Sequence, residues 1–226
     1  MLSVIIVAAG SSERMGFDKL FAPLAGKPVI AHTIDAFERT ACVDEIIVVG
    51  RNDSLAELGK IVGPQTKARK TVAGGALRHD SVRAGLEYVD PTASFVAVHD
   101  AARPLITPEK ITRVFEACRA HGAAALAEPI TDTLKRADVD LFVTESVDRD
   151  QLFAMQTPQI FARELLIEAY TAVAAKNISV TDEVSAVEYL GRKVALVPNQ
   201  DFNFKITYPR DFPMAEFVLR QRAANG

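Results

Sequence analysis

The chain has 226 residues, of which 49% are hydrophobic, enough for the core of one large domain, and we expect a single domain over residues 1–226. Its net charge of −3 gives no basic field for a nucleic-acid backbone, so no nucleic-acid partner is expected. The two cysteines have no metal-ligand spacing, and neither a signal peptide nor an apolar run long enough to span a membrane is present, so the sequence predicts reduced thiols, a cytoplasmic location and no membrane partner.

Strands and helices alternate through the first half of the chain. Apolar runs predict strands at residues 3–8, 45–49, 71–73, 95–99 and 123–128, and the helical period predicts helices at 29–37, 81–89 and 108–121. The helix at 108–121 has Thr107 as its N-cap, Pro108 in its first position and Gly122 after its end. Such a βαβ series predicts an α/β, Rossmann-like fold with a mostly parallel twisted sheet and helices on both faces.

The second half continues with helices and strands but contains one segment of another kind. We expect helices at 163–176 and 181–190, strands at 193–197 and about 202–207, and a closing helix after Pro209. In residues 130–155, short β-type runs alternate with charged residues, and no long helix fits. We interpret this segment as a β-hairpin that projects from the sheet. It is either a solvated surface excursion or an arm that pairs with a second copy of the chain in a homodimer.

The loop AAGSSERMGFDK, residues 8–19, follows the first predicted strand. Gly10 and the two serines after it let backbone N–H groups approach an anion, and Arg14 and Lys19 supply positive charge for a polyphosphate. The loop matches neither the Walker A motif nor G-x-G-x-x-G, so an ordinary connection between a strand and a helix remains an alternative.

Two further polar loops follow predicted strands. In AGGALRHDS, residues 73–81, the glycine pair ending at Gly75 permits close contact with a flat ring, while Ser81 could bind a base edge or cap the next helix. In VHDAARP, residues 98–104, Asp100 offers a hard oxygen ligand for a phosphate-bound metal, or else a structural ion pair with Arg103. Because loops at the carboxyl ends of parallel strands meet at one edge, the three are expected to line one crevice.

Eight motifs occur in a fixed order: AAGSSERMGFDK, GGALRHDSV, HDAARP, TDTLKR, VDR, QTPQIF, TDEVSAVE and NFKIT. Together they resemble the 2-C-methyl-D-erythritol 4-phosphate cytidylyltransferase family of the nucleotide-diphospho-sugar transferase-like superfamily, from Val4 to about Phe217. The first motif is shared with sugar-nucleotide transferases, whereas the later ones are more specific. The resemblance implies transfer of CMP from CTP to 2-C-methyl-D-erythritol 4-phosphate, with release of pyrophosphate, in the non-mevalonate pathway to isoprenoid precursors.

The resemblance also implies roles for individual residues. The catalytic residues would be Arg14, Lys19 and Lys205. The CTP site would comprise Ala8, Ala9, Gly10, Arg14, Lys19, Gly75, Ser81 and Asp100, with Asp100 as the ligand of a Mg²⁺ ion. The methylerythritol phosphate site would comprise Arg103, Thr133, Arg149, Thr181 and Lys205, with Arg149 presented across a dimer by the arm. The substrate phosphate is itself a nucleophile, so this chemistry needs in-line positioning and cations rather than a covalent intermediate.

Two positions depart from the family pattern, and two other functions remain open. The family often has proline where this chain has Asp18, and an acidic residue where it has Ala76. A cytidylyltransferase for ribitol 5-phosphate would share the nucleotide loop, and a catalytically silent nucleotide-binding domain could use the same fold. Retention of cations such as Lys19 and Lys205 argues against the silent domain. The scattered histidines are expected to be structural or on the surface.

Overall fold

A seven-stranded sheet forms the centre of the protein in a computed structural model that describes residues 1–10, 15–63 and 66–224. In spatial order its strands are β11 (Ala195–Pro198), β7 (Ala123–Pro129), β10 (Phe153–Ala162), β6 (Phe95–Asp100), β1 (Leu2–Ala8), β4 (Glu45–Gly50) and β5 (Ala68–Ala73). Neighbouring strands are parallel except β10, which is antiparallel to both β6 and β7. The predicted α/β class with a mostly parallel sheet is therefore confirmed.

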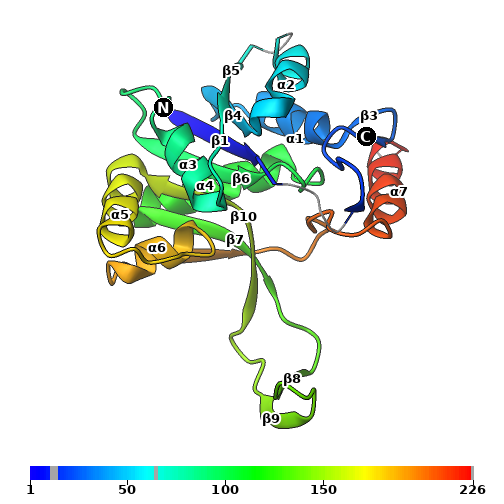
Figure 1. The fold of residues 1–226 in the computed structure, drawn as a ribbon, viewed down its shortest axis with the longest axis vertical. Coiled ribbons are helices and arrows are strands. Elements are labelled where there is room, and N and C mark those ends of the chain that lie inside the picture. Colours follow the sequence, from blue (N-terminus) through cyan, green and yellow to red (C-terminus); the bar gives the residue numbers. More distant parts are fainter. Residues whose placement is uncertain (11–14, 64–65, 225–226) are drawn as a thin grey trace.

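Helices cover both faces of the sheet (Figure 1). One apolar cluster joins the sheet to α1 (Val29–Glu38), α2 (Leu55–Val62), α4 (Pro108–His121) and α7 (Asp211–Ala224), and a second joins it to α3 (Arg78–Leu86), α5 (Arg163–Ala175) and α6 (Glu183–Tyr189). Along β1, Val4 and Ile6 point into the first cluster and Ile5 into the second. A strand buried on both faces is what a run without polar alternation predicts.

The helix boundaries follow the local sequence signals where these are strong. Thr107 accepts a hydrogen bond from the Lys110 amide at 3.4 Å, Pro108 opens α4, and Gly122 ends it with a φ of +83°. The predicted start of α3 at Ser81 was late, because Asp80 accepts a hydrogen bond from the backbone N–H of Leu77 and the helix begins at Arg78. The short helix η2 (Asn52–Ser54) and the helix α2 that follows it were not predicted.

Two strand assignments need correction. Residues 202–207, all described in the structure, are irregular rather than a strand, because their hydrogen bonds go to the loop after β6 and to the irregular part of β10: the Ile206 amide donates to the Ala102 carbonyl, and Asn203 donates to Gln156 and Thr157. Strand β10 was missed, since its first residues lie inside the segment assigned to the hairpin. A register shift between Met155 and Gln159 also breaks its pattern.

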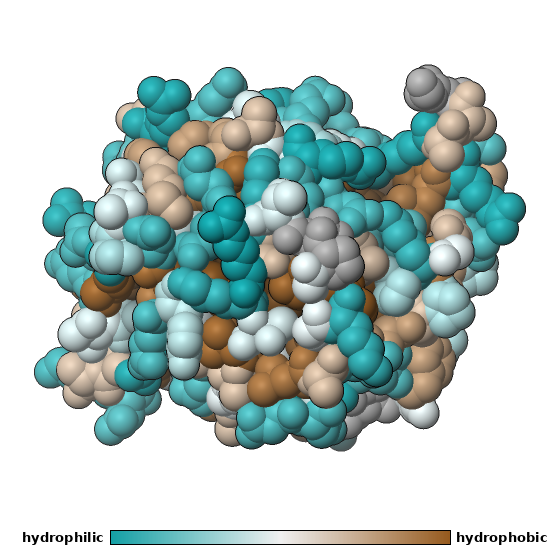
Figure 2. Space-filling model, turned by 90° about the horizontal axis from the view of Figure 1, so that it is seen from above, coloured by the Kyte–Doolittle hydropathy of each residue, from teal (hydrophilic) through white to brown (hydrophobic). Residues whose placement is uncertain are grey.

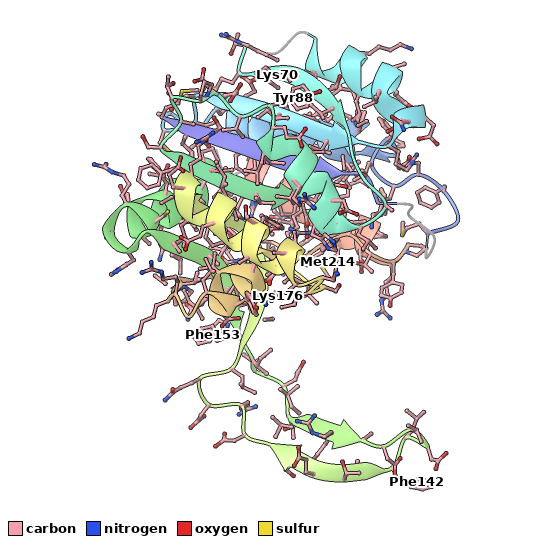
Figure 3. All side chains as sticks on the ribbon, turned by 60° about the vertical axis from the view of Figure 1, so that its left-hand side comes forward. Lys70, Tyr88, Phe142, Phe153, Lys176 and Met214 are labelled. Carbon is pink, nitrogen blue, oxygen red and sulfur yellow. The ribbon has the colours of Figure 1, made fainter. Side chains whose placement is uncertain are left out.

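Residues 130–152 leave the sheet between β7 and β10 and carry the antiparallel pair β8 (Leu134–Ala137) and β9 (Val143–Val147). We call them the arm. Figure 1 shows the arm extending away from the body, and Figure 3 shows Phe142 at its far end and Phe153 at its root. The predicted boundary at residue 155 was too late, because Phe153 already pairs with Pro129 in the main sheet.

The end of the body away from the arm presents hydrophilic side chains with small hydrophobic areas between them (Figure 2). A two-stranded ribbon of β2 (Pro23–Leu24) and β3 (Lys27–Pro28) precedes α1. Among the described residues, no helix combines the length and apolar character needed to span a bilayer.

Candidate active site

Two adjoining cavities lie at the carboxyl ends of the sheet strands. The first, of about 610 Å³, lies among the segments that follow β1, β5, β6 and β11, and its lining includes Ala8, Ala9, Gly10, Lys19, Gly75, Ser81, Asp100 and Lys205. The second, of about 420 Å³, is lined by residues that include Arg103, Gln156, Thr157, Gln159, Thr181, Asp182 and Lys205. Arg78, Asp100 and Lys205 line both cavities. The three polar loops therefore meet in one place, as the sequence predicts.

The glycine pair after β5 lets two of these loops touch. A Cβ on Gly74 would lie 2.7 Å from the Cβ of Ala9 and 2.6 Å from the Oγ of Ser81, and one on Gly75 would lie 2.3 Å from the Cβ of Asp80. Real Cβ contacts are not this short, so a side chain at Gly74 would push the two loops apart, and one at Gly75 would displace Asp80 at the start of α3. Gly74 thus allows the close approach of the loops after β1 and β5, and Gly75 beside it lines the first cavity.

Asp100, at the end of β6, is the anionic centre between the two cavities. Its carboxylate is 3.1 Å from the Nε of Arg78 and 3.0 Å from the Nζ of Lys205, with the Nε of Arg103 at 3.7 Å, and only 11% of the side chain is exposed. Burial alone would raise the pKa of Asp100, but the three neighbouring cations outweigh it and hold the pKa well below its ordinary value. The carboxylate is therefore ionised at neutral pH.

Arg78 is the main residue of this cluster that the sequence analysis missed. Its guanidinium donates to both carboxylate oxygens of Glu183, at 2.7 and 3.0 Å, as well as to Asp100. Glu183 is fully buried and accepts a third hydrogen bond from the hydroxyl of Tyr170 at 2.8 Å. The signal available in the sequence was an arginine between a glycine pair and a helix, in GGALR, but nothing there identifies a glutamate 105 residues away as its partner.

His99 is linked to the backbone of Asp100 through the hydroxyl of Thr157. The Asp100 amide donates to the Oγ1 of Thr157 at 3.1 Å, and this hydroxyl lies 3.0 Å from the Nδ1 of His99. The other ring nitrogen, Nε2, is 3.3 Å from the Arg103 carbonyl, so the chain of bonds is complete when the ring proton is on Nε2. Burial lowers the pKa of His99 to about 3, which keeps the ring neutral. His99 is structural, as expected.

Of the two cations predicted in the loop of residues 8–19, Lys19 is described in the structure and Arg14 is not. The Nζ of Lys19 donates to the Ile206 carbonyl at 2.8 Å, and this lysine lines the first cavity together with Lys205. Arg14 lies outside the described residues, so its predicted role in binding the CTP phosphates stays a prediction. Of the two cations predicted in this loop, the structure therefore places Lys19 at the first cavity.

The residues predicted to bind the second substrate fall into two groups. Arg103, Thr181 and Lys205 line the second cavity. Thr133 and Arg149, both within the described part of the arm, line neither cavity, and Arg149 donates instead to the Thr131 carbonyl. Within one chain, the structure brings together the predicted residues around the two cavities at the carboxyl ends of the strands, a region that we call the sheet end. It does not bring the residues of the arm to this region.

The described carboxylates near the cavities are too few to hold a metal ion by themselves, but they fit an ion that is also bound by a nucleotide. No group of three or more histidine, cysteine or acidic side chains among the described residues could hold a metal ion. Asp100 is the carboxylate that lines both cavities, whereas Glu183 behind it is fully buried. Because Mg²⁺ commonly takes one or two carboxylates plus substrate phosphates, this donor set fits an ion held mainly by a nucleotide.

Comparison with known proteins gives consistent results over almost the whole chain. Residues 2–221 match the model of the 2-C-methyl-D-erythritol 4-phosphate cytidylyltransferase family. The enzyme of this name from Symbiobacterium thermophilum is 40% identical over 98% of this chain and 94% of its own, and that from Halalkalibacterium halodurans is 38% identical over 97% of each.

Solved structures agree with these sequence relatives. The 4-diphosphocytidyl-2C-methyl-D-erythritol synthase of Anaerococcus prevotii superposes with a TM-score of 0.87 at 32% identity, covering 97% of this chain and 96% of its own. The cytidylyltransferase of Thermus thermophilus gives 0.82 at 32% identity, over 96% and 98%. The order of motifs, the strand-end cavities and these matches together establish that the chain belongs to the 2-C-methyl-D-erythritol 4-phosphate cytidylyltransferase family.

Proposed function

We propose that this protein transfers CMP from CTP to 2-C-methyl-D-erythritol 4-phosphate, giving 4-diphosphocytidyl-2-C-methyl-D-erythritol and pyrophosphate. The observation that carries the proposal is that two cavities adjoin at Arg78, Asp100 and Lys205. An in-line displacement needs two phosphorylated substrates to meet end to end, with cations where their phosphates approach. The family membership supports this reaction, and with it a role in isoprenoid precursor synthesis.

CTP would occupy the first cavity. Its base would lie against the Gly75 backbone and Ser81, and its phosphates would extend past Gly10 toward Lys19. Three features support this arrangement: the lining of the cavity, the close approach of Gly74 to Ala9, and the lysine at the cavity. A pocket walled by the glycine pair favours a pyrimidine over a larger purine.

Methylerythritol phosphate would occupy the second cavity, where Arg103 and Thr181 would bind it. An oxygen of its phosphate then forms a bond to the α-phosphorus of CTP while the bond from that phosphorus to the bridging oxygen breaks, and pyrophosphate leaves with the electron pair. Lys19 and Lys205 would stabilise the charge that builds on the α-phosphate and the leaving group. No protein nucleophile or general base is needed, because a phosphate monoester is already anionic.

Mg²⁺ is the proposed cofactor, with Asp100 as its ligand from the protein. When bound, it would neutralise phosphate charge as a Lewis acid. Asp100 also holds Lys205, since the two are 3.0 Å apart in an ion pair. The same carboxylate therefore orients a catalytic cation.

We further propose that the enzyme is a cytoplasmic homodimer in which the arm of one chain presents Arg149 and Thr133 to the other chain's second cavity. What supports this is that both residues lie on the arm, which extends from the body, and that they line neither of the two cavities of their own chain.

The test is a pyrophosphate-release assay with CTP and either methylerythritol phosphate or ribitol 5-phosphate. We expect turnover with the first and little with the second. Faster turnover with ribitol 5-phosphate would establish the alternative cytidylyltransferase, and no turnover with either would favour a silent nucleotide-binding domain.

A further inference from the structure

Arg51, the residue after β4, contacts both ends of the loop of residues 8–19, which we call the nucleotide loop. The guanidinium of Arg51 donates to the Gly10 carbonyl at 3.2 Å and to the Asp18 carboxylate at 2.7 Å. Gly10 lies just after β1, and Asp18 lies just before Lys19. Arg51 thus bridges the entry and the exit of the loop that carries the proposed phosphate-binding cations.

Arg51 is itself fixed to the rigid part of the fold. It directly follows β4, and its carbonyl accepts hydrogen bonds from the backbone N–H and the hydroxyl of Ser54 at 3.0 and 2.9 Å. Its third partner, Asp53, is 75% exposed and gives the weaker ion pair. The side chains of Arg51 and Asp18 are 28% and 27% exposed, so their pair is better shielded from water.

The ion pair with Arg51 neutralises the negative charge of Asp18, which lies next to Lys19. A carboxylate beside Lys19 places a negative charge at a loop that must receive a highly anionic triphosphate, and like charges a few ångströms apart repel. Asp18 also has a local use, since it accepts a hydrogen bond from the Leu20 amide at 3.2 Å. Pairing with Arg51 allows that bond without an uncompensated charge next to Lys19, which lines the first cavity.

We infer that Arg51 is a positioning residue for CTP: it holds Gly10 and Asp18 together and neutralises Asp18, so that Lys19 is presented to the nucleotide phosphates. Arg51 does not line either cavity, and it acts through the loop rather than on the substrate. This inference rests on the proposed binding of CTP in the first cavity.

The experiment is a double-mutant cycle with Arg51→Ala, Asp18→Asn and the combined variant, with Arg39→Ala as a control for loss of an exposed arginine. For Arg51→Ala we expect the KM and the Kd for CTP to rise about fivefold to tenfold, with an unchanged KM for the polyol phosphate, since an uncompensated charge acts on nucleotide binding. Asp18→Asn alone should have a smaller effect, because it leaves no uncompensated negative charge beside Lys19 and Arg51 keeps Asp53 as an ion-pair partner.

The combined variant gives the deciding measurement. If Arg51 neutralises Asp18, adding Asp18→Asn to Arg51→Ala should recover at least half of the lost CTP affinity, and Arg51→Lys should lose less than Arg51→Ala. Simple addition of the two single effects, or unchanged CTP binding in Arg51→Ala, would overturn the inference. Loss of activity in Lys19→Ala together with normal Arg51→Ala would reject only the role of Arg51, whereas normal Lys19→Ala would reject the proposed nucleotide site itself.

Discussion

The sheet end and the arm both carry residues assigned to the active site, but they are built in opposite ways. At the sheet end, Asp100 and Glu183 are buried, and both form short ion pairs with Arg78 on α3. On the arm, the apolar side chains of Val139, Leu141 and Phe142 are 96%, 85% and 72% exposed. The Asp138 carboxylate accepts from the amides of Asp140 and Phe142, so the tip is held mainly by local bonds.

This difference shows which half of the site one chain can complete alone. The buried ion pairs at the sheet end fix their side chains before any ligand arrives, which is what electrostatic stabilisation of a transition state requires. A lone two-stranded ribbon is marginal in water, and exposed apolar residues on it indicate a partner surface. We therefore expect the sheet end to set the chemistry, and the arm to become functional only against a second copy of the chain.

The largest expected effect is at the sheet end. Lys19→Ala should lower kcat/KM by about 10²-fold or more, because it removes a cation that we propose stabilises charge on the triphosphate. The melting temperature should be nearly unchanged, since Lys19 belongs to a loop and contributes little to the core. Lys60→Ala, on the surface of α2, is the matched control and should keep full activity. Activity of Lys19→Ala within twofold of wild type would contradict a triphosphate site here.

The second prediction tests whether the arm acts on another chain. Arg149→Ala alone should be strongly impaired, yet mixing it with Lys19→Ala should restore about a quarter of wild-type activity after subunit exchange. Random exchange makes half of the dimers mixed, and each mixed dimer has one site with both defects and one with neither. Steady-state assays before and after exchange measure the recovery.

Two results would contradict a shared site. One is the absence of rescue when labelled subunits are proven to exchange. The other is a protein that sediments as a monomer at micromolar concentration and still turns over at the full rate.

Sequence reasoning placed the sheet end well because its signals are local. The apolar run of β1, the cap at Thr107 and the glycine pair at Gly75 each act within a few residues, and the topology of parallel strands brings their loops together. Some residues that line the first cavity, Lys19 among them, are therefore predictable from the amino-acid order alone, whereas Arg78 is not.

What the sequence did not reveal depends on contacts between distant segments. The partnership of Arg78 with Glu183 spans 105 residues, and that of Asp18 with Arg51 spans 33. The segment at 202–207 has the composition of a strand, but its hydrogen bonds go to the loop at Ala102 and to the irregular part of β10, so periodicity misassigned it. Strand β10 was hidden because its first residues lie inside the segment 130–155 that was predicted to be the hairpin, and because the strand contains a register shift.

The third prediction concerns the buried network behind Asp100. Glu183→Gln should destabilise the protein by about 3 kcal/mol, because it leaves Arg78 partly buried with one anionic partner instead of two. Tyr170→Phe is the graded control: it removes only the hydroxyl that donates to Glu183 and should cost about 1 kcal/mol. Urea denaturation measures both. A Glu183→Gln variant as stable as Tyr170→Phe would mean that the ion pair does not hold the sheet end together.

The smallest expected effect is on the arm and completes the comparison. Phe142 is 72% exposed, so Phe142→Ser should change the free energy of unfolding by no more than about 0.5 kcal/mol when measured at dilutions where the wild type is monomeric. Phe37→Ser, at a fully buried position in α1, should cost more than about 3 kcal/mol under the same conditions. Sedimentation at higher concentration should reverse the ranking, because only Phe142→Ser removes an apolar side chain from the proposed interface and shifts the protein toward monomer. If Phe142→Ser dimerises as tightly as wild type, the exposed end of the arm does not contribute to association, and the partner surface must lie nearer its root, where Leu134 pairs with Val147.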